Sequence, residues 1–202
     1  MLFKKQKYEN LSDEELVQLS LKDKDSFYYI VQRYGPKILR YIKRTTNVSQ
    51  EDAEDILQEI FIKVYRNLNS YKPYLPFSSW IYRIAHNEVI NHYHKTKTYK
   101  EMSRLNIESE DVKSLVEAIQ EDGDVQDKVI FLENAEKIKE MLAELPAKYR
   151  EVLILRYLEE KSYNEISDIL RKPPGSVATL INRAKSRLKK IAEQHGLKES
   201  YE

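Results

Sequence analysis

Residues 171–190, RKPPGSVATLINRAKSRLKK, carry the clearest structural signal in the chain. Pro173 and Pro174 cannot lie in the interior of a helix, but they suit its first turn, where a missing backbone N–H costs nothing. The preceding SYNEISDIL is typical of another helix, so we expect two helices joined by a tight turn. After the prolines, apolar residues recur at helical spacing and predict one buried face, made of Val177, Ile181, Ala184, Leu188 and Ile191.

The other side of this second helix is rich in groups that can donate hydrogen bonds to phosphates and base edges. We predict a helix-turn-helix whose second helix enters the major groove of duplex DNA and reads bases with its N-terminal turns. The alternative is an amphipathic bundle helix with a solvated basic face. The helix pair, the turn and the basic end of the chain favour DNA. The candidate contacts are Ser176, Thr179, Asn182, Arg183, Ser186, Arg187 and Lys190.

Charge is unevenly distributed along the 202 residues, although the formal net charge is only +1. Residues 1–98 carry a net charge of +4 and residues 171–202 carry +5. Between them, residues 99–127 carry −6 and residues 128–170 carry −2. Two basic ends around an acidic middle are typical of a protein whose partner has a phosphate backbone.

Composition and periodicity predict an all-α fold. Glycine is scarce, with 4 residues, and the sequence is rich in charged residues and leucine. From Ser12 onward we expect successive helices: one opened by SDEEL, one that Gly35-Pro36 ends, and a short one over residues 37–45. A longer helix starts at Ser49, and FSSWIYRIAHNEVINHYHK forms the next one. PAKYREVLILRYLEE is apolar nearly all round and should be a buried helix.

Residues 99–127 lose this periodicity and gain acidic residues. We therefore predict two small helical domains, residues 1–98 and 128–202, joined by an acidic flexible linker, residues 99–127. At most a weak helix is expected in the linker, around residues 115–119. The chain has no cysteines, which excludes disulfides and thiolate metal sites, and neither a secretory signal nor a membrane-spanning run is expected.

Two further surfaces in the first domain are candidates for binding. The helix from Ser49 presents acidic residues opposite its apolar stripe, which in most proteins is only a solvated face. The following region mixes aromatic and basic residues, a composition that suits stacking of unpaired bases and contact with their phosphates. Arg83, Asn87, His94 and Lys97 share one polar side, whereas Trp80 is expected to be mainly structural.

Two long segments resemble one known family. DAEDILQEIFIKVYRNL followed by FSSWIYRIAHN is similar to region 2 of an extracytoplasmic-function (ECF) RNA polymerase sigma factor. LPAKYREVLILRYLEEKSYNEISDIL followed by PPGSV is similar to region 4 of the same family. The match covers most of residues 12–192 in the right order.

The resemblance implies that the chain directs core RNA polymerase to specific promoters and initiates DNA melting at the −10 element, and it assigns residues to these roles. The polymerase contacts, on the largest subunit's clamp coiled coil, would be Asp52, Asp55, Gln58 and Glu59. Region 4 would bind the −35 promoter element as duplex. Asn87 matches a position implicated in capturing a flipped base of the −10 element. The complete set of residues expected to hold the single-stranded −10 element is Tyr71, Trp80, Arg83, Asn87, His94, Lys95 and Lys97.

The resemblance also predicts the partners: core RNA polymerase, promoter DNA as duplex and as single strand, and an anti-sigma factor, in the cytoplasm. The acidic linker would thread through polymerase channels as a weak mimic of RNA; the alternative is a plain spacer. One departure concerns Ala178 and Leu180, where relatives commonly have Lys or Arg, so a −35 consensus cannot be transferred.

No enzyme, cofactor or metal site is expected. His92 and His94 are two residues apart and so point to different sides of a helix, and no glycine-rich phosphate loop occurs. Two rival functions remain. A free-standing helix-turn-helix regulator would bind its operator alone, usually as a symmetric dimer. A recombinase or nuclease would cleave strands in the absence of polymerase.

Overall fold

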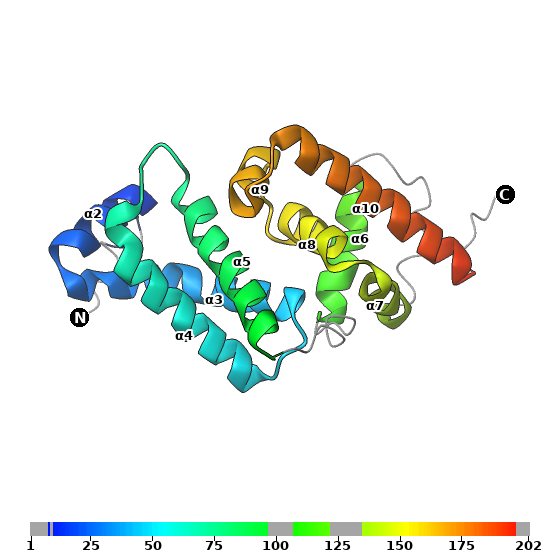
Figure 1. The fold of residues 1–202 in the computed structure, drawn as a ribbon, viewed down its shortest axis with the longest axis horizontal. Coiled ribbons are helices and arrows are strands. Elements are labelled where there is room, and N and C mark those ends of the chain that lie inside the picture. Colours follow the sequence, from blue (N-terminus) through cyan, green and yellow to red (C-terminus); the bar gives the residue numbers. More distant parts are fainter. Residues whose placement is uncertain (1–7, 9, 97–106, 122–134, 197–202) are drawn as a thin grey trace.

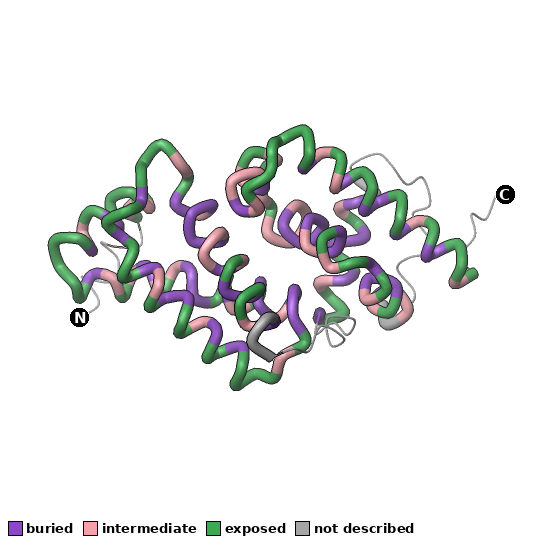
Figure 2. Tube along the Cα trace, in the orientation of Figure 1, coloured by how far each residue is buried: buried purple, intermediate pink, exposed green. Residues whose placement is uncertain are grey.

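The structure is a computed structural model that describes residues 8, 10–96, 107–121 and 135–196. All regular elements in these ranges are helices, and they form two adjoining lobes (Figure 1). The first lobe contains α2 to α5 and the second contains α6 to α10. Buried residues lie along the sides of the helices that face one another within each lobe (Figure 2). The predicted all-α, two-lobed architecture is confirmed.

The first lobe begins with a capped helix. In α2 (Asp13–Lys22), the Ser12 side chain accepts from the Glu15 backbone N–H, and the Glu15 carboxylate accepts from the Ser12 N–H. This reciprocal capping satisfies two backbone donors that would otherwise lack a partner at the helix start. A 3-10 turn, η1 (Lys24–Ser26), leads into α3 (Phe27–Thr45).

The predicted helix break at Gly35-Pro36 is wrong, because α3 runs through both residues. A proline inside a helix loses one backbone hydrogen bond, but its fixed φ is helical and need not end the helix. Gly35 is buried and Pro36 is exposed, so the ring points to solvent while the opposite side of α3 enters the core. That apolar side holds the helix together across the missing bond. Its buried members include Ile30, Tyr34, Ile38, Tyr41 and Ile42.

Two long helices complete the first lobe. Ser49 caps α4 (Gln50–Asn67) by accepting from the Asp52 N–H, as its position in the sequence predicts. After the short η2 (Leu68–Ser70) and a loop, α5 (Phe77–Thr96) returns and packs on both α3 and α4. The core between these helices is made of Ala53, Ile56, Ile60, Val64, Phe77, Ile81, Ala85 and Val89.

The segment predicted to be a linker contains a full helix, α6 (Ser109–Glu121), where at most a weak one was expected. Val112, Leu115, Val116 and Ile119 are all buried, and α6 packs on α7 (Ala135–Glu144) and η4 (Ile154–Leu158). Glu110 and Glu117 of α6 are exposed on its other side, and the acidic composition of the whole segment is why charge alone suggested a linker. Residues 99–106 and 122–127 of the predicted linker lie outside the described residues.

The rest of the second lobe follows the sequence pattern. The apolar segment forms α8 (Ala147–Leu153), which continues into the π-helical η4 and is buried over most of its length. Then α9 (Tyr163–Leu170), capped by Ser162 and Glu165, and α10 (Pro174–Gln194) form the predicted helix-turn-helix. None of the helices in the described part of the chain combines the length and the hydropathy that crossing a bilayer requires.

Candidate nucleic-acid interface

The helix α10 presents one polar side to solvent, whereas Lys185 is buried. Its opposite side, with Val177, Ile181, Ala184 and Leu188, is buried against α8 and α9. Arg171 ends α9 in the left-handed conformation, with φ of 51°, and so turns the chain toward α10. The predicted contact residues are all exposed: Ser176, Thr179, Asn182, Arg183, Ser186, Arg187 and Lys190.

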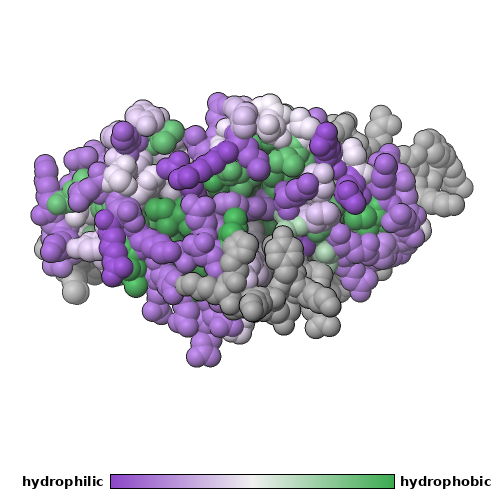
Figure 3. Space-filling model, in the orientation of Figure 1, coloured by the Kyte–Doolittle hydropathy of each residue, from purple (hydrophilic) through white to green (hydrophobic). Residues whose placement is uncertain are grey.

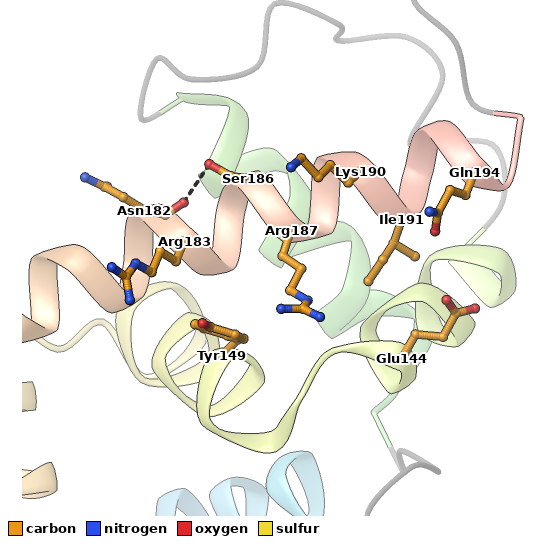
Figure 4. Close-up of a pocket in the computed structure, with 9 residues that line it drawn as sticks. All are labelled: Glu144, Tyr149, Asn182, Arg183, Ser186, Arg187, Lys190, Ile191 and Gln194. Carbon is orange, nitrogen blue, oxygen red and sulfur yellow. Dashed lines mark hydrogen bonds between the residues drawn. The ribbon is translucent and has the colours of Figure 1, made fainter.

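An open groove of about 870 Å³ runs beside α10, between it and the junction of α7 and α8 (Figure 4). Arg183 and Arg187 extend from α10 toward Tyr149 of α8, while Asn182 points away from Tyr149. The Arg187 guanidinium lies 5.9 Å from the centroid of the Tyr149 ring, a separation at which cation and ring attract each other. The ring therefore orients one of the two guanidinium groups, and both can bind phosphate.

Two hydroxyls on α10 already donate within the helix. Thr179 Oγ1 donates to the Gly175 carbonyl at 2.9 Å, and Ser186 Oγ donates to the Asn182 carbonyl at 3.0 Å. Their lone pairs remain able to accept from a base amino group.

The turn before α10 supplies two basic residues that the sequence analysis did not select. Arg171 and Lys172 are both exposed and precede the N-terminus of α10, where an approaching phosphate is favoured. They stand in the stretch from which the helix-turn-helix was predicted. The sequence analysis selected only residues on the polar side of the helix, and these two residues precede its start.

The acidic face of α4 is accessible over its full length. Asp52, Asp55, Gln58 and Glu59 are exposed, and the Ser49 hydroxyl donates to the Asp52 carboxylate at 2.7 Å. Seven residues after Asp55 and Gln58, and thus on the same side of the helix, lie Ile62 and Tyr65, which are 48% and 41% exposed. Ile62 and Tyr65 thus continue the exposed side of α4 beyond its acidic residues. Neither was selected from the sequence.

The residues predicted to hold the −10 strand are divided by the structure. Arg83 is half-buried and Asn87 is exposed, one turn apart on α5. Tyr71 and Trp80 are buried, with 7% and 6% of their surfaces exposed. The side chains of His94 and Lys95, and all of Lys97, lie outside the described residues.

Tyr71 is a packing residue in this structure. Its ring packs edge-on against Phe77, with centroids 5.2 Å apart, and its hydroxyl donates to the Leu75 carbonyl at 2.8 Å. Burial, with Glu14 nearby, raises the pKa of Tyr71 to about 12. A base cannot stack on either buried ring, so burial argues against the predicted contacts of Tyr71 and Trp80. The exposed aromatic of this loop is Tyr74, at 76%.

The described histidine side chains of α5 belong to no candidate metal site. Within the described ranges no group of three or more His, Asp or Glu side chains is placed to hold a metal ion. His86 instead has its Nδ1 2.5 Å from the Glu151 Oε1 of the second lobe.

Comparison with known proteins matches both lobes. Residues 30–98 match the family model for Sigma-70 region 2, and residues 135–188 match that for Sigma-70 region 4. The ECF RNA polymerase sigma factor SigW of Bacillus subtilis (strain 168) is 36% identical over 185 residues, which cover 90% of this chain and 97% of SigW.

Two solved structures share the fold at low sequence identity. CnrH, in complex with the cytosolic domain of CnrY, has a TM-score of 0.62 at 19% identity, over 90% of this chain and 97% of CnrH. The sigma factor RpoE from Bartonella quintana, in complex with the anti-sigma factor NepR, has a TM-score of 0.57 at 20% identity, over 83% and 96%. Together with the two matched regions and the exposed faces of α4 and α10, the similarity to SigW shows that this chain belongs to the ECF family of RNA polymerase sigma factors, which direct polymerase to promoters.

Proposed function

We propose that the two lobes divide the promoter between them, with the second lobe on duplex −35 DNA and the first on the single-stranded −10 element. The single observation that carries the −35 assignment is the arrangement of α10, whose polar face is exposed while its apolar face is buried. In this proposal Asn182 and Arg183 read base edges, and Arg187 and Lys190 bind phosphates. Arg171 and Lys172 add phosphate contacts at the start of the helix.

On the first lobe, α4 docks on core polymerase through Asp52, Asp55, Gln58 and Glu59. Ile62 and Tyr65 support this role, because apolar side chains next to charged ones are typical of a protein interface. The carboxylates give the surface its orientation, and the apolar pair adds buried area.

The −10 element is captured by the face of α5 with Arg83 and Asn87 and by the loop before it. As a sigma factor the chain performs no covalent chemistry, so melting is driven by differential binding: unstacking a base costs a few kcal/mol, and stacking and hydrogen bonding of the flipped base offset it. Tyr74 replaces Tyr71 as the stacking residue because it is the exposed one.

The domain division follows the same assignment: residues 1–98 for region 2, 99–127 for the segment that joins the two regions in the sequence, and 128–202 for region 4. The helix α6 limits the proposed RNA mimicry, since it packs on the second lobe and its Asp111 is already paired with Arg44. Mimicry is thus confined to the remaining acidic residues of the segment.

An anti-sigma factor is the proposed regulator, and the cytoplasm is the proposed compartment. RpoE of Bartonella quintana, which shares the fold, was solved in complex with an anti-sigma factor. The exposed faces of α4 and α10 are the surfaces that such a partner would have to cover to prevent polymerase and promoter binding.

The test is transcription from genomic DNA by core polymerase with and without the purified chain. We expect a set of start sites that appears only with the chain and shares two upstream sequence elements. Size-exclusion chromatography of the chain with core polymerase should show one complex. Separate elution of the two would contradict the proposal and favour a free-standing regulator, and strand cleavage by the chain alone would favour a recombinase or nuclease.

A further inference from the structure

Among the described residues, one acidic side chain lines the groove beside α10, where the other charged residues of the lining are basic. Arg183, Arg187 and Lys190 contribute cations from α10, and Glu144 contributes a carboxylate from the end of α7. The Glu144 side chain is 48% exposed, so its charge acts directly on a molecule that approaches the groove. The groove therefore contains a group that repels phosphate among groups that attract it.

The position of Glu144 is fixed from two sides. Arg150, which is 2% exposed, donates from its Nη1 to the Ala143 and Leu145 carbonyls, both at 3.4 Å. These bonds hold the backbone on either side of Glu144. On the solvent side, Glu144 Oε1 lies 2.7 Å from the Nε2 of His195, the residue that follows α10. The carboxylate is thus held at the C-terminal end of the groove.

The other end of the groove attracts phosphate. The Lys148 ammonium lies 5.0 Å from the centroid of the Tyr149 ring, and the Arg187 guanidinium lies 5.9 Å from it. Arg183 also extends toward this ring, whereas Glu144 lies at the opposite end of the groove (Figure 4). The charge along the groove therefore changes from uniformly positive beside Tyr149 to mixed at the end where Glu144 lies.

We propose that Glu144 is a specificity-determining residue, whose carboxylate keeps the sugar–phosphate backbone of DNA out of the C-terminal end of the α10 groove. This inference rests on the proposed binding of −35 DNA by α10. Non-specific binding is supplied by phosphate contacts and uses every cation that the duplex can reach. With Glu144 in place, the backbone is held near the N-terminal half of α10, whose residues read base edges. Glu144 thus weakens non-specific binding more than specific binding and raises the ratio between the two affinities.

The composition of the groove favours a nucleic acid over a protein as its occupant. The uncharged polar residues of the lining are Asn182, Ser186 and Gln194, and its two apolar or aromatic residues, Tyr149 and Ile191, are each 8% exposed. The centre of a protein interface needs apolar side chains that become buried on binding, and these two are already buried within the lobe. The groove is also continuous with the exposed polar side of α10.

The first experiment measures binding of the full chain to two labelled duplexes by fluorescence anisotropy at low salt. One duplex carries the more distant of the two upstream elements shared by the chain-dependent start sites, and the other carries that element scrambled. We expect Glu144→Gln to raise the affinity for the scrambled duplex about threefold to tenfold, and the affinity for the other by less than about twofold. It should also steepen the salt dependence on the scrambled duplex by about one phosphate contact.

Glu117→Gln is the matched control, because it removes the same charge at an exposed position of α6 that does not line the groove. Equal effects of the two changes would overturn the inference, since only the net charge would then matter. Weaker binding of Glu144→Gln to the duplex with the element would also overturn it, because Glu144 would then be a favourable contact.

Two further measurements separate the charge of Glu144 from its contacts. His195→Gln removes the partner but keeps the carboxylate, so it should not raise the affinity for the scrambled duplex, and a rise equal to that of Glu144→Gln would overturn the inference. Co-elution of Glu144→Gln with core polymerase should be unchanged; its loss would indicate that the groove holds a protein and would overturn the inference too. Equal binding of the parent chain to both duplexes would instead count against the proposed −35 assignment, and the change on the scrambled duplex would still decide whether Glu144 repels the backbone.

Discussion

At the scale of single residues, the two arginines of the α10 groove have different surroundings. Arg187 rests near the ring of Tyr149, whereas Arg183 is exposed one turn closer to the start of the helix. The guanidinium of Arg187, oriented by the ring, is suited to bind a phosphate. Arg183 is nearer the N-terminal turns, which are the part of a recognition helix that reaches base edges.

Arg183→Ala should therefore weaken −35-dependent initiation by about 1–3 kcal/mol and relax the preference for one base pair. Lys190→Ala is the comparison, and as a phosphate contact it should weaken binding about equally on all sequences and reduce the salt dependence. Binding to a library of −35 variants measures both effects. An unchanged sequence profile for Arg183→Ala would remove it from the reading residues.

Asn87→Ala should lower open-complex formation and leave polymerase binding intact, because Asn87 is exposed on α5 and contributes nothing to the core. Asn91→Ala, an exposed asparagine one turn later, should change neither. Permanganate reactivity of unpaired thymines measures opening, and co-elution with core polymerase measures binding. Equal loss of both would mean that Asn87 is structural.

Tyr71 and Tyr74 separate packing from base contact. Tyr71→Phe removes the hydroxyl bound to Leu75 and should cost about 0.5–1.5 kcal/mol of folding free energy without affecting melting. Tyr74→Ala should leave stability unchanged and weaken single-strand binding by about 1–3 kcal/mol. Urea denaturation and binding to a single-stranded −10 oligonucleotide give the two quantities. The reverse pattern would restore Tyr71 as the contact.

At the scale of helices, the sequence predicted the starts that have a local signal. Ser12, Ser49 and Ser162 each cap a helix, and Pro174 takes the first position of α10. Local signals failed where tertiary packing decided the outcome. The break expected at Pro36 is overridden by the buried side of α3.

The helix α6 was underestimated for a related reason. The linker was predicted from the net charge of residues 99–127 taken together. Within this segment the apolar residues follow the spacing i, i+3, i+4, i+7 of an amphipathic helix: Val112, Leu115, Val116 and Ile119. Burial needs only one side of a helix, so an acidic segment can still pack.

Leu115→Ala should accordingly destabilise the second lobe by about 2–5 kcal/mol, because the side chain is fully buried between helices. Glu117→Ala, at an exposed position of the same helix, should be near neutral. Urea denaturation followed by circular dichroism measures the difference. A plain spacer would tolerate both changes equally.

At the scale of the whole molecule, the surfaces for polymerase and DNA could be predicted, but the contact between the lobes could not. The exposed face of a helix can be predicted from the periodicity of its own segment. The pairing of Arg44 with Glu159 joins residues 115 positions apart, and nothing local distinguishes them from solvated charges. The outer surface shown in Figure 3 is largely hydrophilic over both lobes. A charged residue in the sequence is therefore expected at the surface, and the sequence does not distinguish the few that are buried.

Two tyrosines of the first lobe, Tyr41 and Tyr82, make its contact with the second lobe sensitive to alkaline pH. Burial, with Glu151 nearby, holds the pKa of Tyr41 well above its usual value of about 10, and burial beside Glu159 does the same for Tyr82. Both hydroxyls donate to these carboxylates, and a phenolate there would repel them. A pKa that is raised while the lobes are in contact contributes stability that is complete below about pH 10 and is lost as the pH rises further.

The chain has no cysteine, so Gln18→Cys on α2 and Glu140→Cys on α7, both exposed, give one fluorophore site on each lobe. Energy transfer between the two fluorophores should therefore stay constant from neutral pH to about pH 10 and fall above it. Tyr41→Phe with Tyr82→Phe removes both ionisable hydroxyls and should move the onset of the fall to higher pH, even if the contact at neutral pH is weaker. Tyr74→Phe, at an exposed tyrosine, is the control and should leave the onset where it is. Absorbance at 295 nm, followed in the same titration, reports tyrosine ionisation and tests whether it accompanies opening. If the double variant opens at the same pH as the parent chain, the alkaline transition does not arise from the hydroxyls that Glu151 and Glu159 bind.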